Sequence, residues 1–250
     1  MIHSIVKNKR TYFILGILFV FVIWELGKIY YNNDYIVPGV GQTISSLRKL
    51  LTEDYTYKVL LYTFFRLFVS VFVCLIIAVI LALFSKVSSR FKMFIRPIVT
   101  LFKTLPIAVV IVLLLVMLKS NALYYIVGVV ILPMIYEATI NGLELIDKNI
   151  VDEVKMVSNI NFEVVKNVYL PLTLPYIFTA LLQSFGLGLK VLVMAEFISN
   201  AKHSIGYEIM LYKDHYNDMS YVYAWSIILI IFVLIVDYLV NIVHKRSLVQ

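Results

Sequence analysis

The stretch from Val59 to Phe84 reads VLLYTFFRLFVSVFVCLIIAVILALF and holds a single charged residue, Arg66. An α-helix needs about 20 largely apolar residues to cross roughly 30 Å of hydrocarbon. A membrane β-strand would instead alternate apolar and polar residues over about ten positions, and this stretch is apolar on every face. The stretch therefore predicts a transmembrane α-helix.

The composition extends this interpretation to the whole chain. Of the 250 residues, 62% are hydrophobic and only 15% are charged. A soluble domain cannot bury so much apolar surface, so we expect an all-α, polytopic membrane protein. The chain is read as one domain over residues 1–250 with about six spans. The expected spans are 12–30, 59–84, 98–118, 123–140, 170–198 and 221–243.

The basic residues predict how these spans are oriented. With a cytoplasmic N-terminus, the inside segments hold twelve Lys and Arg residues and the outside segments hold six. The segment Ser85–Arg96 carries four cations and no anion, which indicates a cytoplasmic loop. We expect a multi-pass protein of a bacterial inner (plasma) membrane with both termini in the cytoplasm. The net charge of +7 follows mostly from this topology and requires no nucleic acid partner.

The first apolar run has two interpretations. Lys7, Lys9 and Arg10 precede it, as they would precede the apolar part of a signal peptide. No small-x-small cleavage site follows, so a retained membrane anchor is favoured.

A polar segment, DEVKMVSNINFEVVKNVYLP over Asp152–Pro171, interrupts the second half of the chain. Its charged residues alternate with apolar ones, and Pro171 and Pro175 interrupt the backbone where the next span begins. A short amphipathic helix beside a turn suits docking into the groove of a soluble partner. The alternative is an ordinary cytoplasmic loop that lies on the membrane.

This polar segment resembles the EAA loop of ABC-importer permeases, in which Glu-Ala-Ala precedes a Gly and, further on, an apolar-x-Leu-Pro. Glu153-Val154 and the closing Val168-Tyr-Leu-Pro171 match its two ends. Asn159 stands at the glycine position, or Ser158 does if Asp152 takes the acidic one. The glycine itself is absent in either alignment.

Further segments resemble the nitrate/sulfonate/taurine branch of these permeases, in the same order from about Phe21 to Met210. The matching segments are Trp24 with Ile36-Val-Pro38, Thr63-Phe-Phe-Arg66, Arg96-Pro97 through Lys103-Thr-Leu-Pro106, Ala195-Glu196, and Ser204-Ile-Gly206-Tyr207. The chain departs from the branch after Pro106, where aliphatic residues replace a second Pro and a Phe-Gly pair.

The resemblance implies the permease subunit of an ATP-driven ABC importer, which is not itself an enzyme. The loop at about residues 147–167 would be the coupling helix that docks on a cytoplasmic ATP-binding subunit. The residues expected to couple are Asp152, Glu153, Ser158, Asn159 and Phe162.

Other components are implied by the same resemblance. The chain has no Gly-x-x-x-x-Gly-Lys-Ser/Thr phosphate loop, so ATP and Mg²⁺ are expected on a separate subunit and no cofactor on this one. A second permease chain, forming a homodimer, and an extracytoplasmic solute-binding protein complete the expected assembly in the lipid bilayer.

Ionisable residues inside the expected spans mark candidates for a pathway or gate, because charge within a membrane is costly. They are Arg66, Lys103, Lys190 and Glu196, joined by Pro106, which bends a helix and frees a carbonyl. The excess of cations favours a small anion such as a sulfonate, nitrate or taurine. The structural alternative pairs Arg66 with Glu196 and extends Lys190 to the membrane interface.

Two other classes of protein remain open. A gradient-driven secondary transporter or channel would show inverted repeats and broken helix pairs, and the sequence has no such symmetry. A membrane enzyme needs a cluster of catalytic groups at one interface. We find none, and His203, His215, Asp214 and Asp218 fit no compact set of metal ligands. No catalytic or metal-binding residue is therefore expected.

Overall fold

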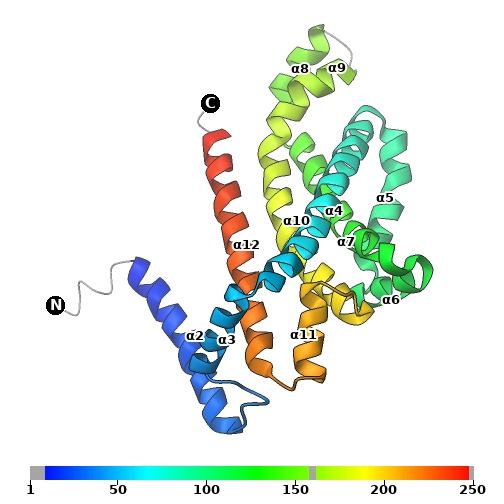
Figure 1. The fold of residues 1–250 in the computed structure, drawn as a ribbon. Coiled ribbons are helices and arrows are strands. Elements are labelled where there is room, and N and C mark those ends of the chain that lie inside the picture. Colours follow the sequence, from blue (N-terminus) through cyan, green and yellow to red (C-terminus); the bar gives the residue numbers. More distant parts are fainter. Residues whose placement is uncertain (1–8, 158–161, 248–250) are drawn as a thin grey trace, which may run out of the picture.

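The computed structural model describes residues 9–157 and 162–247, and within these residues every regular element is helical (Figure 1). The longer helices are α2 (Lys9–Tyr31), α4 (Asp54–Val87), α7 (Ala122–Glu144), α10 (Leu170–Ser199) and α12 (Met219–Ser247). The shorter ones are α3 (Val40–Thr52), α5 (Ser89–Thr104), α6 (Ile107–Leu118), α8 (Lys148–Val157), α9 (Phe162–Val164) and α11 (Ile205–Asp214). The prediction of an all-α membrane protein is confirmed.

Helix α7 lies at the centre of the core, packed against both α4 and α10. Its buried side chains include Ile126, Ile131 and Ile135, all fully buried. Gly188 of α10 allows this close packing, because a Cβ there would lie 3.1 Å from Leu67 Cδ1 of α4. The three helices therefore form the rigid body on which the polar sites are built.

Helix α2 is attached more loosely than the other long helices. Its most apolar window, Ile14–Tyr31, buries none of its residues within the chain. Contact comes through Trp24, whose Nε1 donates a hydrogen bond of 2.9 Å to the Pro38 carbonyl and whose ring lies 5.3 Å from that of Tyr223. A helix that exposes apolar side chains in this way is suited to contact with lipid.

Five described helices are long and apolar enough to cross a membrane, and a broken pair, α5 and α6, can supply a sixth span. The expected span over residues 98–118 is therefore broken rather than continuous. The helix axis bends by 101° between α5 and α6. Pro106 explains the break, because it lacks an N–H and disfavours helical geometry at Leu105, which is extended at φ −65° and ψ 130°.

The polar segment at 147–167 is mostly helical, and its residues 158–161 lie outside the described part of the chain. Helix α8 stands beyond the end of the bundle (Figure 1). Residues Val165–Tyr169 then form a π-helical turn, in which the Leu170 N–H bonds the Val165 carbonyl. In a regular α-helix the ring of Pro171 would clash with the Asn167 carbonyl, and the wider turn relieves that clash.

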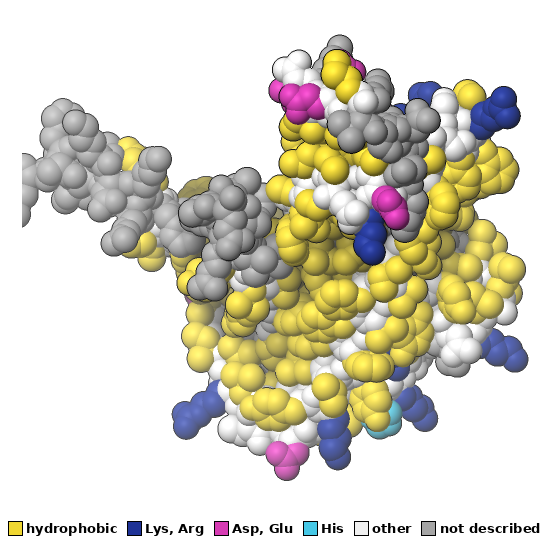
Figure 2. Space-filling view, turned by 90° about the horizontal axis from the view of Figure 1, so that it is seen from above, with side chains coloured by type: hydrophobic (Ala, Val, Ile, Leu, Met, Phe, Trp, Pro, Cys, Tyr) yellow, Lys and Arg dark blue, Asp and Glu magenta, His cyan; other side chains and the backbone are white. Residues whose placement is uncertain are grey.

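The surface seen from the α8 end is mostly hydrophobic (Figure 2). Charged side chains are few in this view and stand mainly toward its edge.

Candidate functional site

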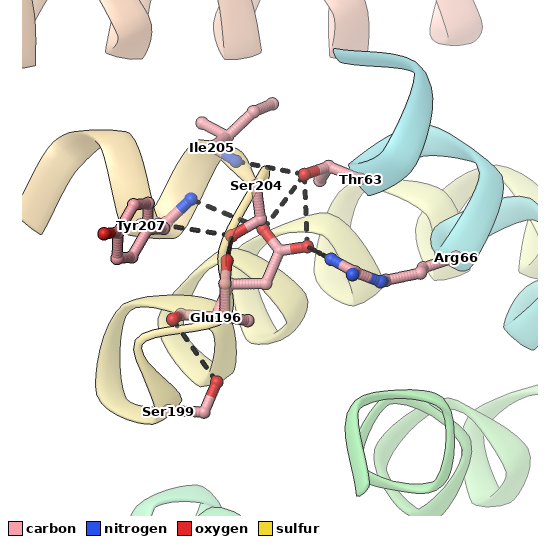
Figure 3. Close-up of polar contacts among 9 residues, drawn as sticks. Thr63, Arg66, Glu196, Ser199, Ser204, Ile205 and Tyr207 are labelled. Carbon is pink, nitrogen blue, oxygen red and sulfur yellow. Dashed lines mark hydrogen bonds and ion pairs between the residues drawn. The ribbon is translucent and has the colours of Figure 1, made fainter. Parts of the chain in front are cut away.

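The most enclosed polar group of the candidate set is the carboxylate of Glu196 on α10, whose side chain is fully buried. Two residues of α4 reach it (Figure 3). Thr63 Oγ1 lies 3.1 Å from both carboxylate oxygens, and Arg66 Nη1 lies 3.0 Å from Oε1. Because Thr63 and Arg66 are three residues apart on a helix, both side chains point to the same side of α4.

The first turn of α11 completes this cluster. The Gly206 N–H points at Glu196 Oε2 at 3.4 Å, and the Ile205 N–H donates to Thr63 Oγ1 at 3.1 Å. Ser204 caps the helix by accepting a hydrogen bond of 3.2 Å from the Tyr207 N–H. The positive end of the helix dipole thus adds to Arg66 in stabilising the carboxylate.

Gly206 is required for the close approach of α11 to α10. A Cβ at this position would lie 2.4 Å from the Val193 carbonyl oxygen and 2.5 Å from the Phe197 nitrogen. Both are backbone atoms, which cannot move aside like the end of a flexible side chain. The cluster of Thr63, Arg66, Glu196 and the α11 N-terminus therefore joins three helices, and the pairing alternative for Arg66 is the one observed.

Arg66 also borders a pocket of about 690 Å³ at the end of the bundle opposite α8. Lys119 and Lys202 line the same pocket, and Leu115 and Leu123 contribute apolar walls. Among the described residues, neither lysine has an acidic partner. Three cations around one cavity, of which only Arg66 is neutralised, make this pocket attractive to an anion.

Lys103 lies elsewhere, at the end of α5. Its Nζ is 2.6 Å from Glu137 Oε2 on α7, and the two side chains are 49% and 41% exposed. Lys92 and Glu144 form a second ion pair between the same two helices. Pro106 follows Lys103 at the break between α5 and α6, where it caps the N-terminus of α6.

Lys190 is separate from both groups. Its side chain is exposed on α10 and borders a pocket of about 540 Å³ between α10 and α12. The other pocket residues are almost all apolar, among them Met194 and Leu229. The five pathway candidates are therefore not one site: Arg66 and Glu196 meet, whereas Lys103 and Lys190 stand in other places. The pathway role of all five stays a prediction.

The coupling candidates lie on α8 and α9. Asp152 and Glu153 are exposed on α8, next to half-buried Val151 and Val154. Ser158 and Asn159 lie outside the described residues. Phe162 is the first residue of α9, and its side chain is outside the described part as well. The part of this segment that can be described is thus an amphipathic helix with an acidic exposed side.

A second buried carboxylate, Glu208 on α11, was not among the candidates. It is 7% exposed and accepts a hydrogen bond of 2.9 Å from the Tyr55 hydroxyl. Burial raises the pKa of Glu208 above its ordinary value near 4.5, while the Tyr55 hydrogen bond and the nearby His203 ring act in the opposite direction. Among the described residues, no group of three or more His, Cys, Asp or Glu side chains could hold a metal ion.

The predicted pathway residues also left out Lys119, Lys202, Glu137 and Glu144. Lys119 and Lys202 stand just beyond the ends of α6 and α10, and a cation beside a span end is too common to single out. Glu137 and Glu144 are seven residues apart, so they share one face of α7. That spacing is a usable signal once α5 is known to pack on the same face.

Comparisons with known proteins agree with this architecture. A family model for the binding-protein-dependent transport system inner membrane component matches residues 74–249. Two similar solved structures are both described as inward-facing conformations of the MetNI methionine ABC transporter. One, from a SeMet soak crystal form, has a TM-score of 0.67 at 17% identity and covers 74% of this chain and 92% of its own. The other, from a native crystal form, has a TM-score of 0.64 at 16% identity and covers 76% and 93%.

At 17% and 16% identity, the two solved structures show that this chain shares their fold and nothing further. No curated protein matches the sequence.

Proposed function

Because the chain belongs to the family of binding-protein-dependent transport system inner membrane components, we propose that two copies of it form the pathway of an ATP-driven importer for a small anion. The chain is a multi-pass membrane protein and the permease component of a binding-protein-dependent ABC importer, and it is not itself an enzyme. What we propose is that two copies pair, which class of substrate they carry and which other partners they bind.

Helix α8 is the element through which ATP hydrolysis acts on the pathway. The observation that carries this role is its position beyond the end of the bundle (Figure 1). Asp152 and Glu153 are exposed on this helix. Val151 and Val154 are half-buried on the inner side, so a partner that moves α8 also moves the helices behind it. Each copy engages one cytoplasmic ATP-binding subunit, which carries ATP and Mg²⁺.

This arrangement, together with the basic residues of the inside segments, supports one orientation of the chain in the membrane. The α8 end lies in the cytoplasm of a bacterium, together with both termini, and the chain crosses the inner membrane. An extracytoplasmic binding protein delivers the solute at the opposite end, where α11 and the pocket of Arg66, Lys119 and Lys202 lie.

A small anion is the substrate class that this pocket supports best. Lys119 and Lys202 are exposed cations at its rim, and the apolar walls suit a compact organic anion. Together with the sequence resemblance, this supports the nitrate/sulfonate/taurine branch. The solved relatives are named for methionine, so methionine is the proper comparison substrate.

The coupling role is tested by purifying the tagged chain from its own membranes and measuring the ATP hydrolysis that comes with it. We expect the wild type to bring ATPase activity and the Asp152→Lys, Glu153→Arg double variant to lose most of it. The matched control is Asp214→Lys, an exposed acid on α11 at the other end of the bundle, which should retain the activity. If the wild type brings no ATPase, the importer proposal fails.

The substrate is tested in liposomes that contain the whole transporter and its binding protein. We expect ATP-driven uptake of a radiolabelled sulfonate, and loss of that uptake when Lys119 and Lys202 are both replaced by glutamine. Preferred uptake of methionine, unchanged by the double substitution, would contradict the anion assignment while leaving the coupling role intact.

A further inference from the structure

Helix α5 exposes two faces of opposite character over the same length. Lys92, Arg96, Thr100 and Lys103 follow at intervals of four, four and three residues, so they form one row along the helix. Apolar side chains are exposed on the other side at the same levels, with Phe94 66% and Leu101 53% exposed. A helix of this kind meets a hydrocarbon environment on one side and a polar one on the other.

Helix α7 carries a matching row. Glu137, Asn141 and Glu144 are separated by four and three residues; Asn141 and Glu144 are exposed, and Glu137 is half-buried. The ion pairs Lys92–Glu144 and Lys103–Glu137 join the two rows. We call the combined surface the α5–α7 strip; its members are Lys92, Arg96, Thr100, Lys103, Glu137, Asn141 and Glu144.

The strip extends well into the membrane-spanning part of the bundle. At 1.5 Å per residue, Thr100 and Lys103 lie roughly 16 and 21 Å along α5 from its start at Ser89. Helix α5 packs against both α4 and α7, two of the long apolar helices. A row of half-exposed charges facing lipid at this depth would be costly. The strip therefore faces water or other protein.

Water is the better match for the strip. Arg96 is exposed and has no acidic partner among the described residues, so a dry contact would leave an uncompensated buried cation. The five charged members comprise three cations and two acids, which leaves one excess positive charge per copy. Such a surface raises the local concentration of small anions.

We propose that the α5–α7 strips of two copies line a water-filled passage in the half of the membrane nearest α8, and that Arg96 makes this passage selective for anions. The inference rests on the proposed importer with two permease copies. It deepens that function by identifying the wall of the pathway, because none of these residues touches the Arg66 pocket.

The test is thiol labelling of the complete transporter, with its ATP-binding subunits, in nanodiscs that leave both membrane faces open. The parent carries Cys74→Ala, which removes the only cysteine of the chain. Single cysteines are introduced at Thr100 on the strip and at Leu101 on the apolar face, one residue further on. The reagents are an anionic sulfonatoethyl and a cationic trimethylammonium-ethyl methanethiosulfonate, with rates normalised to free glutathione.

Because the thiolate reacts only where water reaches it, we expect the Thr100→Cys variant to react at least about tenfold faster than the Leu101→Cys variant. The anionic reagent should outpace the cationic one severalfold at the Thr100→Cys site, and adding Arg96→Gln should abolish this preference.

Two outcomes would overturn the inference while the importer stands. Equal labelling of the two variants, in a transporter that keeps its ATP-binding subunits and ATP-driven uptake, would mean that the strip does not face water. Fast labelling without a preference for the anionic reagent would remove the selective role of Arg96. A parent without ATP-driven uptake would instead contradict the proposed function, and with it this inference.

Discussion

Two ion pairs of this chain have similar chemistry and opposite surroundings. Glu196 is fully buried and meets Arg66, Thr63 and the N-terminus of α11. Glu137 meets Lys103 alone among the described residues, with both side chains more than 40% exposed. The difference shows that the role of a charged side chain in a span depends on how many hydrogen-bond partners surround it. The donors around Glu196 come from two other helices, so this buried pair holds three helices together. The exposed Lys103–Glu137 pair can still interact with water or ions at the surface.

The largest expected effect comes from breaking the buried pair. Replacing Glu196 with leucine leaves Arg66 without its partner and removes the acceptor of the Thr63 hydroxyl. Removing one member of a buried pair typically costs about 3–5 kcal/mol. We expect a loss of this order in the free energy of unfolding, measured by denaturant titration in mixed micelles.

Two controls separate burial from charge in that experiment. Glu137→Leu breaks the exposed pair and should change the free energy of unfolding by no more than about 1 kcal/mol. The double variant Arg66→Met, Glu196→Leu removes both charges and should recover part of the loss, since no isolated charge remains. A double variant as unstable as Glu196→Leu would show that the uncompensated cation is not the cause.

A somewhat smaller effect is expected from the packing that brings α11 to Glu196. Gly206→Ala places a methyl group 2.4 Å from the Val193 carbonyl oxygen, so α11 must shift away from α10. Overpacking of this kind costs about 1–3 kcal/mol. The same titration measures it, and the hydrogen bond from Gly206 to Glu196 should weaken with the shift.

The matched control for this packing is Gly41→Ala in α3, where no atom lies within 4 Å of the added methyl group. Alanine in a helix is favoured over glycine by roughly 0.5–1 kcal/mol, so this variant should be neutral or slightly stabilised. Equal losses at Gly206 and Gly41 would refute the packing explanation.

The sequence predicted the helical class of this fold because a continuous apolar run long enough to cross a membrane forms an α-helix there. It marked Pro106 as a bend but predicted one continuous span over residues 98–118. The helix breaks there because Pro106 lacks an N–H and disfavours helical geometry at Leu105. The 101° between α5 and α6 was beyond such reasoning, because the packing of α6 on α7 sets that angle.

The polar sites were predicted less completely than the fold. Arg66 and Glu196 are 130 residues apart, so their pairing was one of two open alternatives until three helices were placed in space. Lys119 and Lys202 meet at one pocket only because α6 and α10 end at the same level of the bundle. Contacts of this kind depend on tertiary arrangement, which residue spacing within a single helix does not report.

Glu208 extends the comparison to a second buried carboxylate. It lies on α11, outside the long apolar helices, and accepts a hydrogen bond from the Tyr55 hydroxyl. The His203 ring and the Glu53 carboxylate lie further away. Tyr55 also approaches His203 Nδ1 at 3.4 Å, and Glu53 adds negative charge nearby. Among the described residues, no arginine pairs with this carboxylate, and burial raises its pKa.

The smallest expected effect is a pH dependence that Glu208 should produce. Its folded-state pKa lies above the ordinary value near 4.5, so the native state holds the proton more tightly than the unfolded chain does. The stability contributed by the neutral carboxyl is fully present below that ordinary value and is lost as the pH rises through the folded pKa. Glu208→Gln should remove this decline when the free energy of unfolding is measured across pH. Tyr55→Phe, which deletes a donor to the charged form, should shift the decline to higher pH, and an unchanged profile in Glu208→Gln would assign the titration to another group.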